Sequence, residues 1–246
     1  MPSLDPHYTD PVLVALYDAE CGWSADRAFY AALPGPAPIR VLDIGCGTGL
    51  IAARIAQGGH DVTGVDPAGA MLDVARQRPC GDTVRWVEGF ADAAQGPFDL
   101  IYMTGHAFQT LLQDTEIAGL FTTVRRLLAP MGRFVFETRN PRQDWAGRWH
   151  HRKEIEGPDG PVTLSRWVDE ARADQITFTT RYHLPEGPKD SISTLRFLDL
   201  PAIRQHAARA GLDMQRTLGD WSGGAFDPIA SDEIICELRL ARKDPR

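Results

Sequence analysis

A glycine-rich turn between a short apolar segment and a helix constrains this chain more than any other feature. Residues 39–44 predict a buried strand, and residues 50–57 predict a helix that ends at Gly58 and Gly59. The turn between them reads Gly45-Cys46-Gly47-Thr48-Gly49. Glycine allows a sharp turn and a close approach of a ligand to the backbone, and the free amides of the helix start are partly positive. This turn therefore predicts a binding site for a nucleotide-like ligand.

Strands and helices alternate through the first part of the chain. An N-terminal helix from Asp10 to Ala32 ends before the proline-rich residues 34–38. Predicted strands then lie at residues 39–44, 61–65, 83–88, 98–103 and 133–138, and predicted helices at residues 50–57, 69–78 and 117–128. Such alternation is typical of a mostly parallel sheet with helices on both faces.

The pattern changes after residue 140. Extended segments predict a hairpin at residues 162–170 and 175–183 and a further strand at 191–198, before a helix at 201–210 and strands at 212–218 and 233–240. We expect an α/β fold with a doubly wound, Rossmann-like sheet of about seven strands, the last one antiparallel, and an antiparallel β insertion after the fifth strand. The expected division is a helical cap at 1–38, a cofactor-binding core at 39–140 and 199–246, and an insertion at 141–198 that acts as a substrate lid.

Composition limits the class of partner and the compartment. The 246 residues include 26 Lys and Arg against 33 Asp and Glu, a net charge of −7, which disfavours a nucleic-acid partner. The cysteines are far apart, which predicts free thiols in a reducing compartment and no metal site. The first residues do not resemble a leader, and no apolar run is long enough to cross a bilayer. We expect a cytoplasmic monomer or homodimer with no membrane partner.

Two acidic residues at strand ends narrow the class of ligand. Gly47, Gly49 and Ala52 satisfy a loose dinucleotide pattern, but the carboxylate of Asp43 just before the turn would repel a pyrophosphate. That carboxylate suits a cation such as S-adenosylmethionine (SAM), which carries an ammonium and a sulfonium and no phosphate. Asp66 ends the second predicted strand, where an acid accepts hydrogen bonds from ribose hydroxyls or, alternatively, caps the following helix.

Residues 41–49, 62–72 and 98–112 resemble the motifs of the class I SAM-dependent methyltransferases, and with the fifth strand they span residues 39–138. The resemblance implies SAM as cofactor and S-adenosylhomocysteine as product. It assigns the methionine part of SAM to Asp43, Gly45, Gly47 and Gly49, the ribose to Asp66, and the surroundings of the adenine to Met71. We add to the predicted cofactor site the neighbouring residues Cys46, Pro67 and Thr104.

The segment after the third strand departs from this family. Members commonly carry Gly-Asp-Ala there, and the Asp accepts a hydrogen bond from the adenine amino group, whereas this chain reads Gly89-Phe90-Ala91-Asp92. Either Asp92 turns toward the adenine or Phe90 packs against it, and in both cases the Ala91 amide remains available to the ring. All three residues therefore belong to the predicted cofactor site.

Three residues are candidates for catalysis or for binding the methyl acceptor: His106, Tyr17 and Arg139. The end of the fourth strand places His106 near the reacting centre, either as a base or as a cap of the next helix. The stretch 104–111 and the pair Arg139-Asn140 resemble glycine N-methyltransferase-like enzymes, in which the arginine binds a substrate carboxylate. An ion pair with Glu137 or another acid is the alternative for Arg139.

Aromatic residues complete the predicted site. We expect Tyr17, Phe29 and Tyr30 to fold over SAM, since aromatic faces attract sulfonium and ammonium groups, and Trp221 to lie on a loop at the acceptor pocket. Ordinary packing is the alternative for each. The insertion offers further candidates for substrate contact: Trp167, Arg181, Tyr182, His183 and Arg196. His150 and His151 lack a matching set of ligands and are predicted to lie on the surface.

These observations predict SAM-dependent transfer of a methyl group to a nitrogen or oxygen of a small acceptor. A sulfonium is already activated, so such an enzyme needs mainly positioning and desolvation, and no nucleophile triad or metal cluster. The alternatives are a SAM-binding protein without methyl transfer and a nicotinamide-dependent oxidoreductase on a similar core. An enzyme that acts on tRNA or protein is disfavoured by the net charge of −7.

Overall fold

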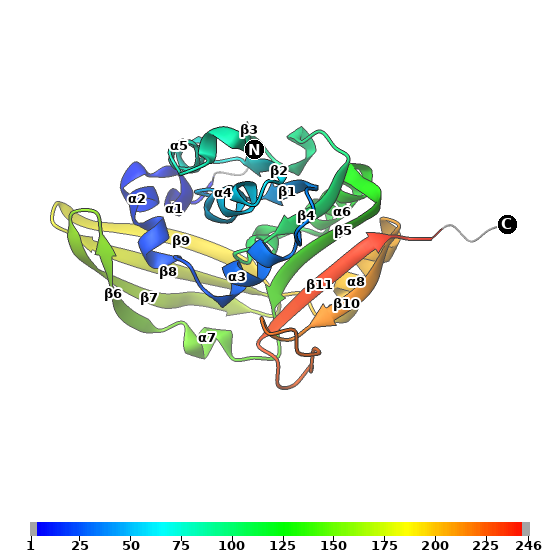
Figure 1. Ribbon diagram of the computed structural model, residues 1–246. Helices are drawn as coiled ribbons and strands as arrows, with labels where there is room; N and C mark the ends of the chain where they lie inside the picture. The colour runs from blue at the N-terminus through cyan, green and yellow to red at the C-terminus, as the bar shows by residue number, and fades with distance from the viewer. Residues whose placement is uncertain (1–3, 243–246) are drawn as a thin grey trace.

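The computed structural model describes residues 4–242, which form two β-sheets (Figure 1). The larger sheet has seven strands in the order β10-β11-β5-β4-β1-β2-β3. Its strands are β1 (Arg40–Ile44), β2 (Asp61–Asp66), β3 (Arg85–Glu88), β4 (Phe98–Met103), β5 (Leu128–Arg139), β10 (Leu212–Leu218) and β11 (Glu233–Leu240). Strands β1 to β5 pair in parallel, and β11 runs antiparallel to both β5 and β10. The predicted Rossmann-like sheet with an antiparallel last strand is confirmed.

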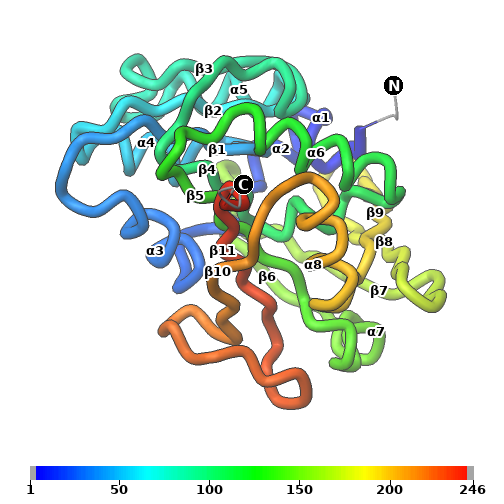
Figure 2. Tube along the Cα trace, turned by 90° about the vertical axis from the view of Figure 1, so that its right-hand side faces the viewer, coloured from blue at the N-terminus to red at the C-terminus, as the bar shows by residue number. Residues whose placement is uncertain are grey.

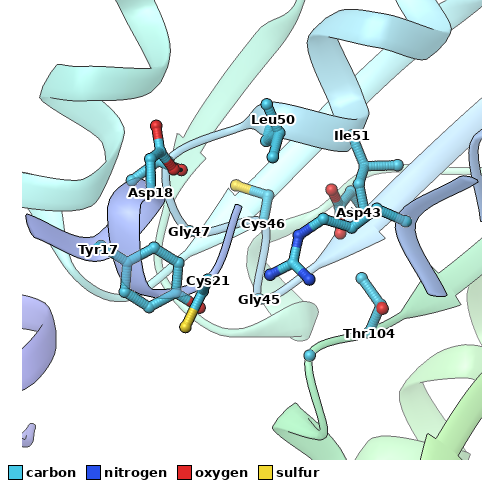
Figure 3. Close-up of a pocket in the computed structure, with 13 residues that line it drawn as sticks. Tyr17, Asp18, Cys21, Asp43, Gly45, Cys46, Gly47, Leu50, Ile51 and Thr104 are labelled. Atoms are coloured by element: carbon cyan, nitrogen blue, oxygen red, sulfur yellow. Dashed lines mark hydrogen bonds between the residues drawn. The ribbon is translucent and has the colours of Figure 1, made fainter. Parts of the chain in front are cut away.

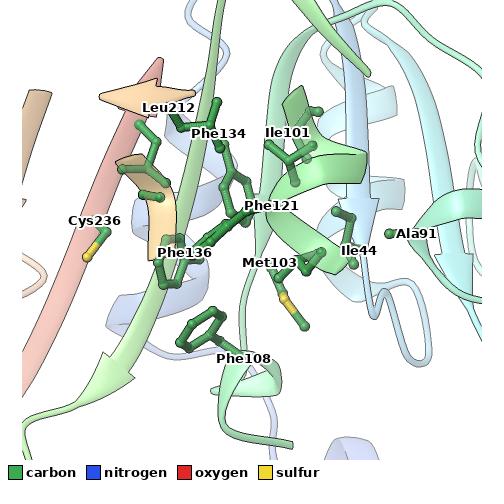
Figure 4. Close-up of a cluster of buried hydrophobic side chains, with 14 of the residues drawn as sticks. Ile44, Ala91, Ile101, Met103, Phe108, Phe121, Phe134, Phe136, Leu212 and Cys236 are labelled. Atoms are coloured by element: carbon green, nitrogen blue, oxygen red, sulfur yellow. The ribbon is translucent and has the colours of Figure 1, made fainter. Parts of the chain in front are cut away.

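Helices cover both faces of this sheet (Figure 2). Helices α3 (Ala25–Ala32) and α4 (Leu50–Gln57) lie on one face, and α6 (Asp114–Leu127) and α8 (Leu200–Arg209) lie on the other. Tyr30 and Ile55 pack on the first face against Leu100. The second face holds a larger core in which Phe121 of α6 meets Phe134 and Phe136 of β5 (Figure 4). These cores fix the strand ends that carry the predicted site.

The insertion after β5 forms the second sheet, which has four strands in the order β6-β7-β8-β9. A short helix, α7 (Trp145–Arg148), leads into β6 (His151–Gly157), β7 (Gly160–Arg172), β8 (Gln175–Leu184) and β9 (Gly187–Arg196). The sequence analysis missed β6 because Ile155 is the only buried residue in that strand, which is otherwise mostly charged. His150 and His151 are exposed, as predicted.

The N-terminal region is broken into three helices, where one helix from residue 10 to residue 32 was predicted. They are α1 (Pro6–Thr9), α2 (Pro11–Glu20) and α3. Helix α2 ends before Gly22, and Ser24 begins α3 in an extended conformation. A side chain at Gly22 would meet the Asp18 carbonyl oxygen at 2.8 Å, so the chain turns where only glycine fits.

The remaining elements adjust the predicted boundaries. Helix α5 (Gly69–Arg76) follows β2, and single 3-10 turns lie at η1 (Gly81–Thr83), η2 (Ala91–Ala93) and η3 (Ala107–Thr110). Helix α6 begins three residues earlier than predicted because Gln113 and Glu116 form a capping box. Within residues 4–242, no helix is long and apolar enough to cross a membrane.

Helices α1 and α2 join the two sheets. We use the word cap from here on for residues 6–20 of these two helices, which are part of the helical region predicted at 1–38. The cap contacts α5 of the core and also β6 and β9 of the four-stranded sheet. Leu13 and Leu16 of α2 pack with Ile155, Leu164 and Tyr182 of that sheet. The cap therefore lies over the carboxyl ends of β1 and β2, where the glycine turn begins (Figure 1).

Candidate functional site

The glycine turn has the backbone that its sequence requires. Gly45, Gly47 and Gly49 have φ values of 70°, 53° and 74°, which lie in the left-handed region. A Cβ on Gly49 would stand 2.5 Å from the Trp86 ring and 2.8 Å from the Ala75 Cβ. The third glycine thus allows α4 to pack tightly against its neighbours, while the first two shape the loop itself.

Asp43 lies at the end of β1 under this turn and is almost fully buried, with 2% exposure. The hydroxyl of Tyr102 donates to its Oδ2 at 2.8 Å, whereas Oδ1 is enclosed and has no partner. Burial, with a smaller effect of the nearby Asp66 and Glu137 carboxyls, raises the pKa of Asp43 to about 7, although the hydrogen bond from Tyr102 lowers it. An enclosed carboxylate oxygen without a donor is an incomplete site for a cation or a hydrogen-bond donor.

Asp66 ends β2 and faces the same turn. Its Oδ2 accepts from the backbone amide of Gly47 and its Oδ1 from that of Ala68, both at 2.8 Å. Burial raises its pKa, against the effect of these two hydrogen bonds. Asp66 therefore binds the glycine turn and the amide of Ala68, the residue before α5 (Gly69–Arg76), and does not cap the amides of that helix. Each oxygen keeps a second lone pair, so a further donor can still bind.

A cavity of about 40 Å³ separates the glycine turn from the cap. In Figure 3, Tyr17, Asp18 and Cys21 lie on one side of it, and Asp43 and Thr104 on the other. Ligand sites for drug-sized molecules usually measure about 300–1,000 Å³. The cap is therefore closed on the turn, and a ligand of nucleoside size needs it to move.

Polar contacts fasten the cap to the turn. The Thr48 hydroxyl donates to Asp18 Oδ1 at 2.6 Å, and the Arg78 guanidinium pairs with the other oxygen of Asp18. Arg27 of α3 also lines the cavity and pairs with Asp26 at 3.0 Å. Asp18, Arg27 and Arg78 were not predicted for the site, because no local pattern links positions 18, 27 and 78 to the turn.

A second polar cluster lies at the ends of β4, β5 and β11. The fully buried Glu137 accepts from the backbone amide of His106 at 2.7 Å and from the hydroxyl of Tyr30. Burial raises the pKa of Glu137. The His106 ring reaches Glu233, with Nε2 at 2.9 Å from Oε2 and 3.1 Å from Oε1. His106 has φ 59°, an unusual value for a residue that is not glycine.

Arg139 does not form the ion pair that was its alternative interpretation. Its guanidinium donates to Gln109 Oε1 at 2.8 Å and lies over the rings of Trp145 and Trp149, 5.5 and 5.1 Å from their centroids. Among residues 4–242, no acid lies within ion-pair distance of Arg139. Burial lowers its pKa to about 10. Glu233 and Glu137 raise this pKa through their charge without touching the guanidinium, and a buried guanidinium without a direct counter-ion is costly.

Comparison with known proteins identifies the core. Residues 41–132 match the family described as a methyltransferase domain. A ubiquinone biosynthesis O-methyltransferase of Psychrobacter arcticus is 34% identical over 136 residues, 51% of each chain. The cypemycin N-terminal methyltransferase of a Streptomyces species is 25% identical over 247 residues, 94% of this chain and 97% of that protein. The chain spans about two fifths to one half of the length of the first curated relatives that it matches.

The match to the methyltransferase domain covers residues 41–132, the part of the chain that holds the glycine turn. The fold agrees over nearly the whole length. The CcbJ methyltransferase from Streptomyces caelestis superposes with a TM-score of 0.77 at 21% identity, over 96% of this chain and 99% of that one. The sugar N-methyltransferase KedS8 from Streptoalloteichus gives 0.73 at 17% identity, over 93% and 92%.

The residues at this turn fit SAM. The enclosed Oδ1 of Asp43 is matched to the ammonium of a methionine, and the acids Asp66 and Glu137 surround the turn with negative charge. The structure brings Asp43, Gly45, Cys46, Gly47, Thr104 and Tyr17 to one cavity. Three of them, Asp43, Gly45 and Gly47, were predicted for the methionine end, whereas the fourth residue of that prediction, Gly49, does not line the cavity. Cys46 and Thr104 were predicted for the cofactor site as a whole, and Tyr17 for the acceptor.

The residues predicted for the adenosine end are spread around the same strand ends. Met71 is buried and packs with Val14 and Ala68 under the cap, and Pro67 is half-buried. Ala91 is buried, whereas Asp92 is exposed and the Phe90 side chain is 49% exposed. An exposed phenylalanine at the end of β3 is available to an adenine ring, so the predicted role of Phe90 stays a prediction.

The other aromatic candidates lie elsewhere. Phe29 and Tyr30 do not fold over the turn: both pack with Trp221 in the core under the sheet. The position of α3 explains this, because the break after α2 sends it across the face of the sheet. In the insertion, Tyr182 donates to Glu20 of the cap, while Arg181 and Arg196 pair with nearby aspartates.

Proposed function

We propose that this protein is a methyltransferase that transfers a methyl group from SAM to a nitrogen or oxygen of a small molecule. The observation that carries the proposal is the unpartnered, enclosed carboxylate oxygen of Asp43 among other acids at the strand ends. An anionic dinucleotide would be repelled there, whereas a ligand with an ammonium and a sulfonium is attracted.

The residues that would hold SAM follow from their places around the turn. Asp43 would accept from the ammonium, and Asp66 from the ribose through its second lone pairs. Arg27 lines the same cavity and offers a guanidinium to the methionine carboxylate. Bound SAM supplies an activated methyl, to which an acceptor lone pair bonds as the carbon–sulfur bond breaks and its electron pair passes to sulfur. The closed cap would exclude water from that site.

The acceptor is inferred from Arg139, His106 and Tyr17. Arg139 has no acidic partner among the described residues and would bind a carboxylate or another anionic group of the acceptor. Burial raises the pKa of Tyr17 well above its usual range, so its hydroxyl stays neutral and would orient the acceptor by a hydrogen bond. His106 would take the polar or basic role.

Similar proteins support a small acceptor. Among them are O-methyltransferases of ubiquinone biosynthesis, the sugar N-methyltransferase KedS8 and CalS10, an amino pentose methyltransferase from Micromonospora echinaspora. CalS10 superposes with a TM-score of 0.68 at 21% identity, over 91% of this chain and 94% of that one. The insertion would serve as the substrate lid. A cytoplasmic location and a monomeric or dimeric state stay predictions from sequence.

The test is incubation with methyl-labelled SAM and a panel of small amines, phenols and amino acids, with each compound paired to an analogue that lacks its carboxylate. We expect labelled product from acceptors that carry an anionic group, and S-adenosylhomocysteine in equal amount. SAM binding by calorimetry with no product from any acceptor would favour a binding protein instead. A change in nicotinamide absorbance on titration would favour the oxidoreductase.

A further inference from the structure

Two acids from different strands hold His106 from opposite ends. Glu137 of β5 binds its backbone amide, and Glu233 of β11 binds its ring. The backbone conformation at φ 59° costs about 1–2 kcal/mol for a residue with a side chain. Surrounding contacts must maintain such a conformation, and it is found mostly where the placement of a side chain matters.

Glu233 binds the ring of His106 although Arg139 lies opposite to it on the neighbouring strand. In the register of β11 with β5, Glu233 is the partner of Arg139, so their side chains share one face of the sheet. A cross-strand ion pair is the ordinary outcome for such residues. Here the carboxylate bonds to His106 and the guanidinium to Gln109, so each member of the expected pair has another partner.

The two nitrogens of the His106 ring are in different surroundings. Nε2 lies against a carboxylate, which can only accept, so the hydrogen of a neutral ring belongs on Nε2. Nδ1 has no hydrogen-bond partner among the described residues and is not one of their enclosed unpartnered atoms, so it is open to solvent. The His106 side chain is 17% exposed, and Thr104 and Gly105, next to it in sequence, line the cavity.

We propose that Glu233 is a positioning residue that fixes the Nε2–H tautomer of His106, so that Nδ1 accepts the proton that the acceptor loses on methylation. The inference rests on the proposed function. The proton passes from the acceptor nitrogen or oxygen to the Nδ1 lone pair, and the resulting imidazolium is stabilised by the Glu233 carboxylate. Tyr30, Glu137 and Arg139 are the other ionisable groups of this cluster.

Histidine nitrogen-15 spectra of the full-length protein test the tautomer without any turnover, with the His106 signal assigned from its loss in His106→Gln. We expect the Nε2–H tautomer in the wild type. Glu233→Leu removes the acceptor and should give a mixture of tautomers, whereas Glu233→Gln retains an acceptor oxygen and should largely keep Nε2–H. Glu237→Leu is the matched control. It also removes a carboxylate from β11, but Glu237 pairs with Arg133 and Arg239 instead of His106.

Kinetics with an acceptor from the panel test the proton step. General-base residues contribute about 10²–10⁴-fold, so His106→Gln should lower kcat by about 100-fold and Glu233→Leu by about tenfold, while SAM affinity stays within about twofold. The double variant should be no slower than His106→Gln alone, because Glu233 acts through His106. Glu237→Leu should leave kcat unchanged.

Several outcomes would overturn the inference while the proposed function stands. These are an Nδ1–H tautomer in the wild type, an unchanged tautomer in Glu233→Leu, or losses of kcat that simply multiply in the double variant. Absence of turnover with every acceptor counts against the proposed function alone, since the spectra still decide whether Glu233 sets the tautomer. A variant that has lost its fold is identified by lost SAM binding, and Glu233→Gln then supplies the result.

Discussion

At the scale of single residues, Asp43 shows how one carboxyl can serve binding at the expense of stability. Burial raises its pKa to about 7, so the folded protein without ligand holds a proton that the unfolded chain releases near pH 3.8. The sign follows from linkage: the folded state binds more protons between these values, so stability falls as pH rises through this window. A bound ammonium would pair with the ionised carboxylate of Asp43 and so offset the free-energy cost of burying that charge.

Asp43→Asn should therefore weaken SAM binding by more than about tenfold at pH 8, because the amide carries no charge to meet the ammonium. The wild-type affinity should fall as pH drops below about 7, when Asp43 takes up its proton. The variant should lose this dependence on pH. Calorimetric titration across the pH range checks both expectations, and full affinity in the variant would remove Asp43 from the site.

The same substitution should stabilise the protein without ligand. One pKa unit corresponds to about 1.4 kcal/mol, so neutralising Asp43 is expected to add about 1–4 kcal/mol at pH 8, or about 2–10 °C in Tm. At pH 5, inside this window, only about a third of the gain should remain, because the unfolded chain is ionised there while the folded carboxyl is protonated. Thermal unfolding at the two pH values measures this difference, and an equal gain at both would contradict the linkage argument.

Arg139→Leu should raise KM for an anionic acceptor by about tenfold or more, since a charge-assisted hydrogen bond contributes about 1.5–3 kcal/mol. SAM affinity should not change. Arg139→Lys keeps the charge but loses the planar fork that lies over the rings of Trp145 and Trp149, and it should recover only part of the effect. Steady-state kinetics with the acceptor and with its carboxylate-free analogue are the measurement. Equal losses for both compounds would exclude recognition of the anion.

At the scale of elements, the glycine turn can join β1 to α4 only because position 49 has no side chain to collide with Trp86 and Ala75. Gly49→Ala should destabilise the protein by about 1–3 kcal/mol more than Gly59→Ala, because overpacking adds to left-handed strain. Both glycines have positive φ, at 74° and 84°, but a Cβ on Gly59 meets nothing within 4 Å. Trp86 cannot simply swing away, since its Nε1 donates to the Gly81 carbonyl oxygen at 2.7 Å. Urea unfolding of the two variants measures the difference, and equal losses would show that the contact with Trp86 is unimportant.

At the scale of the whole molecule, the cap is held between the core and the four-stranded sheet. Toward the sheet, Glu20 pairs with Arg166 at 2.9 Å, and Asp10 pairs with Lys189. Toward the core, Asp18 binds Thr48. These polar contacts add to the apolar packing of Leu13 and Leu16 against the sheet. The partly exposed pair of Asp18 with Arg78, which holds the cap to the turn, is easier to break and re-form than that packing.

The cap should therefore open and close, and SAM or S-adenosylhomocysteine should slow its opening. Hydrogen exchange at residues 6–20 is expected to slow several-fold when ligand saturates the protein, because bound ligand adds contacts in the closed state. Helix α8 packs against α6 and β10, and its exchange serves as the internal control. Unchanged exchange at residues 6–20 would show that ligand enters by another route.

Much of the core could be predicted because its signals are local. The alternation of strands and helices, the turn at Gly45–Gly49 and the acids Asp43 and Asp66 all lie within short segments whose periodicity and sterics are visible in the sequence. Strand β6 was missed because it buries little, and the break before α3 was missed because Gly22 and Ser24 were read as helical. Both errors concern segments whose state depends on tertiary contacts.

The sequence by itself determined the order of the elements, the glycine turn and the acid that precedes it, since short-range sterics and hydrophobic periodicity act between near neighbours. The tertiary structure alone decided which side chains meet. His106 lies 31 positions from Glu137 and 127 from Glu233, and they come together because β11 is inserted beside β5. Closure of the cap over the turn was decided in the same way, by packing between segments that are far apart in the chain.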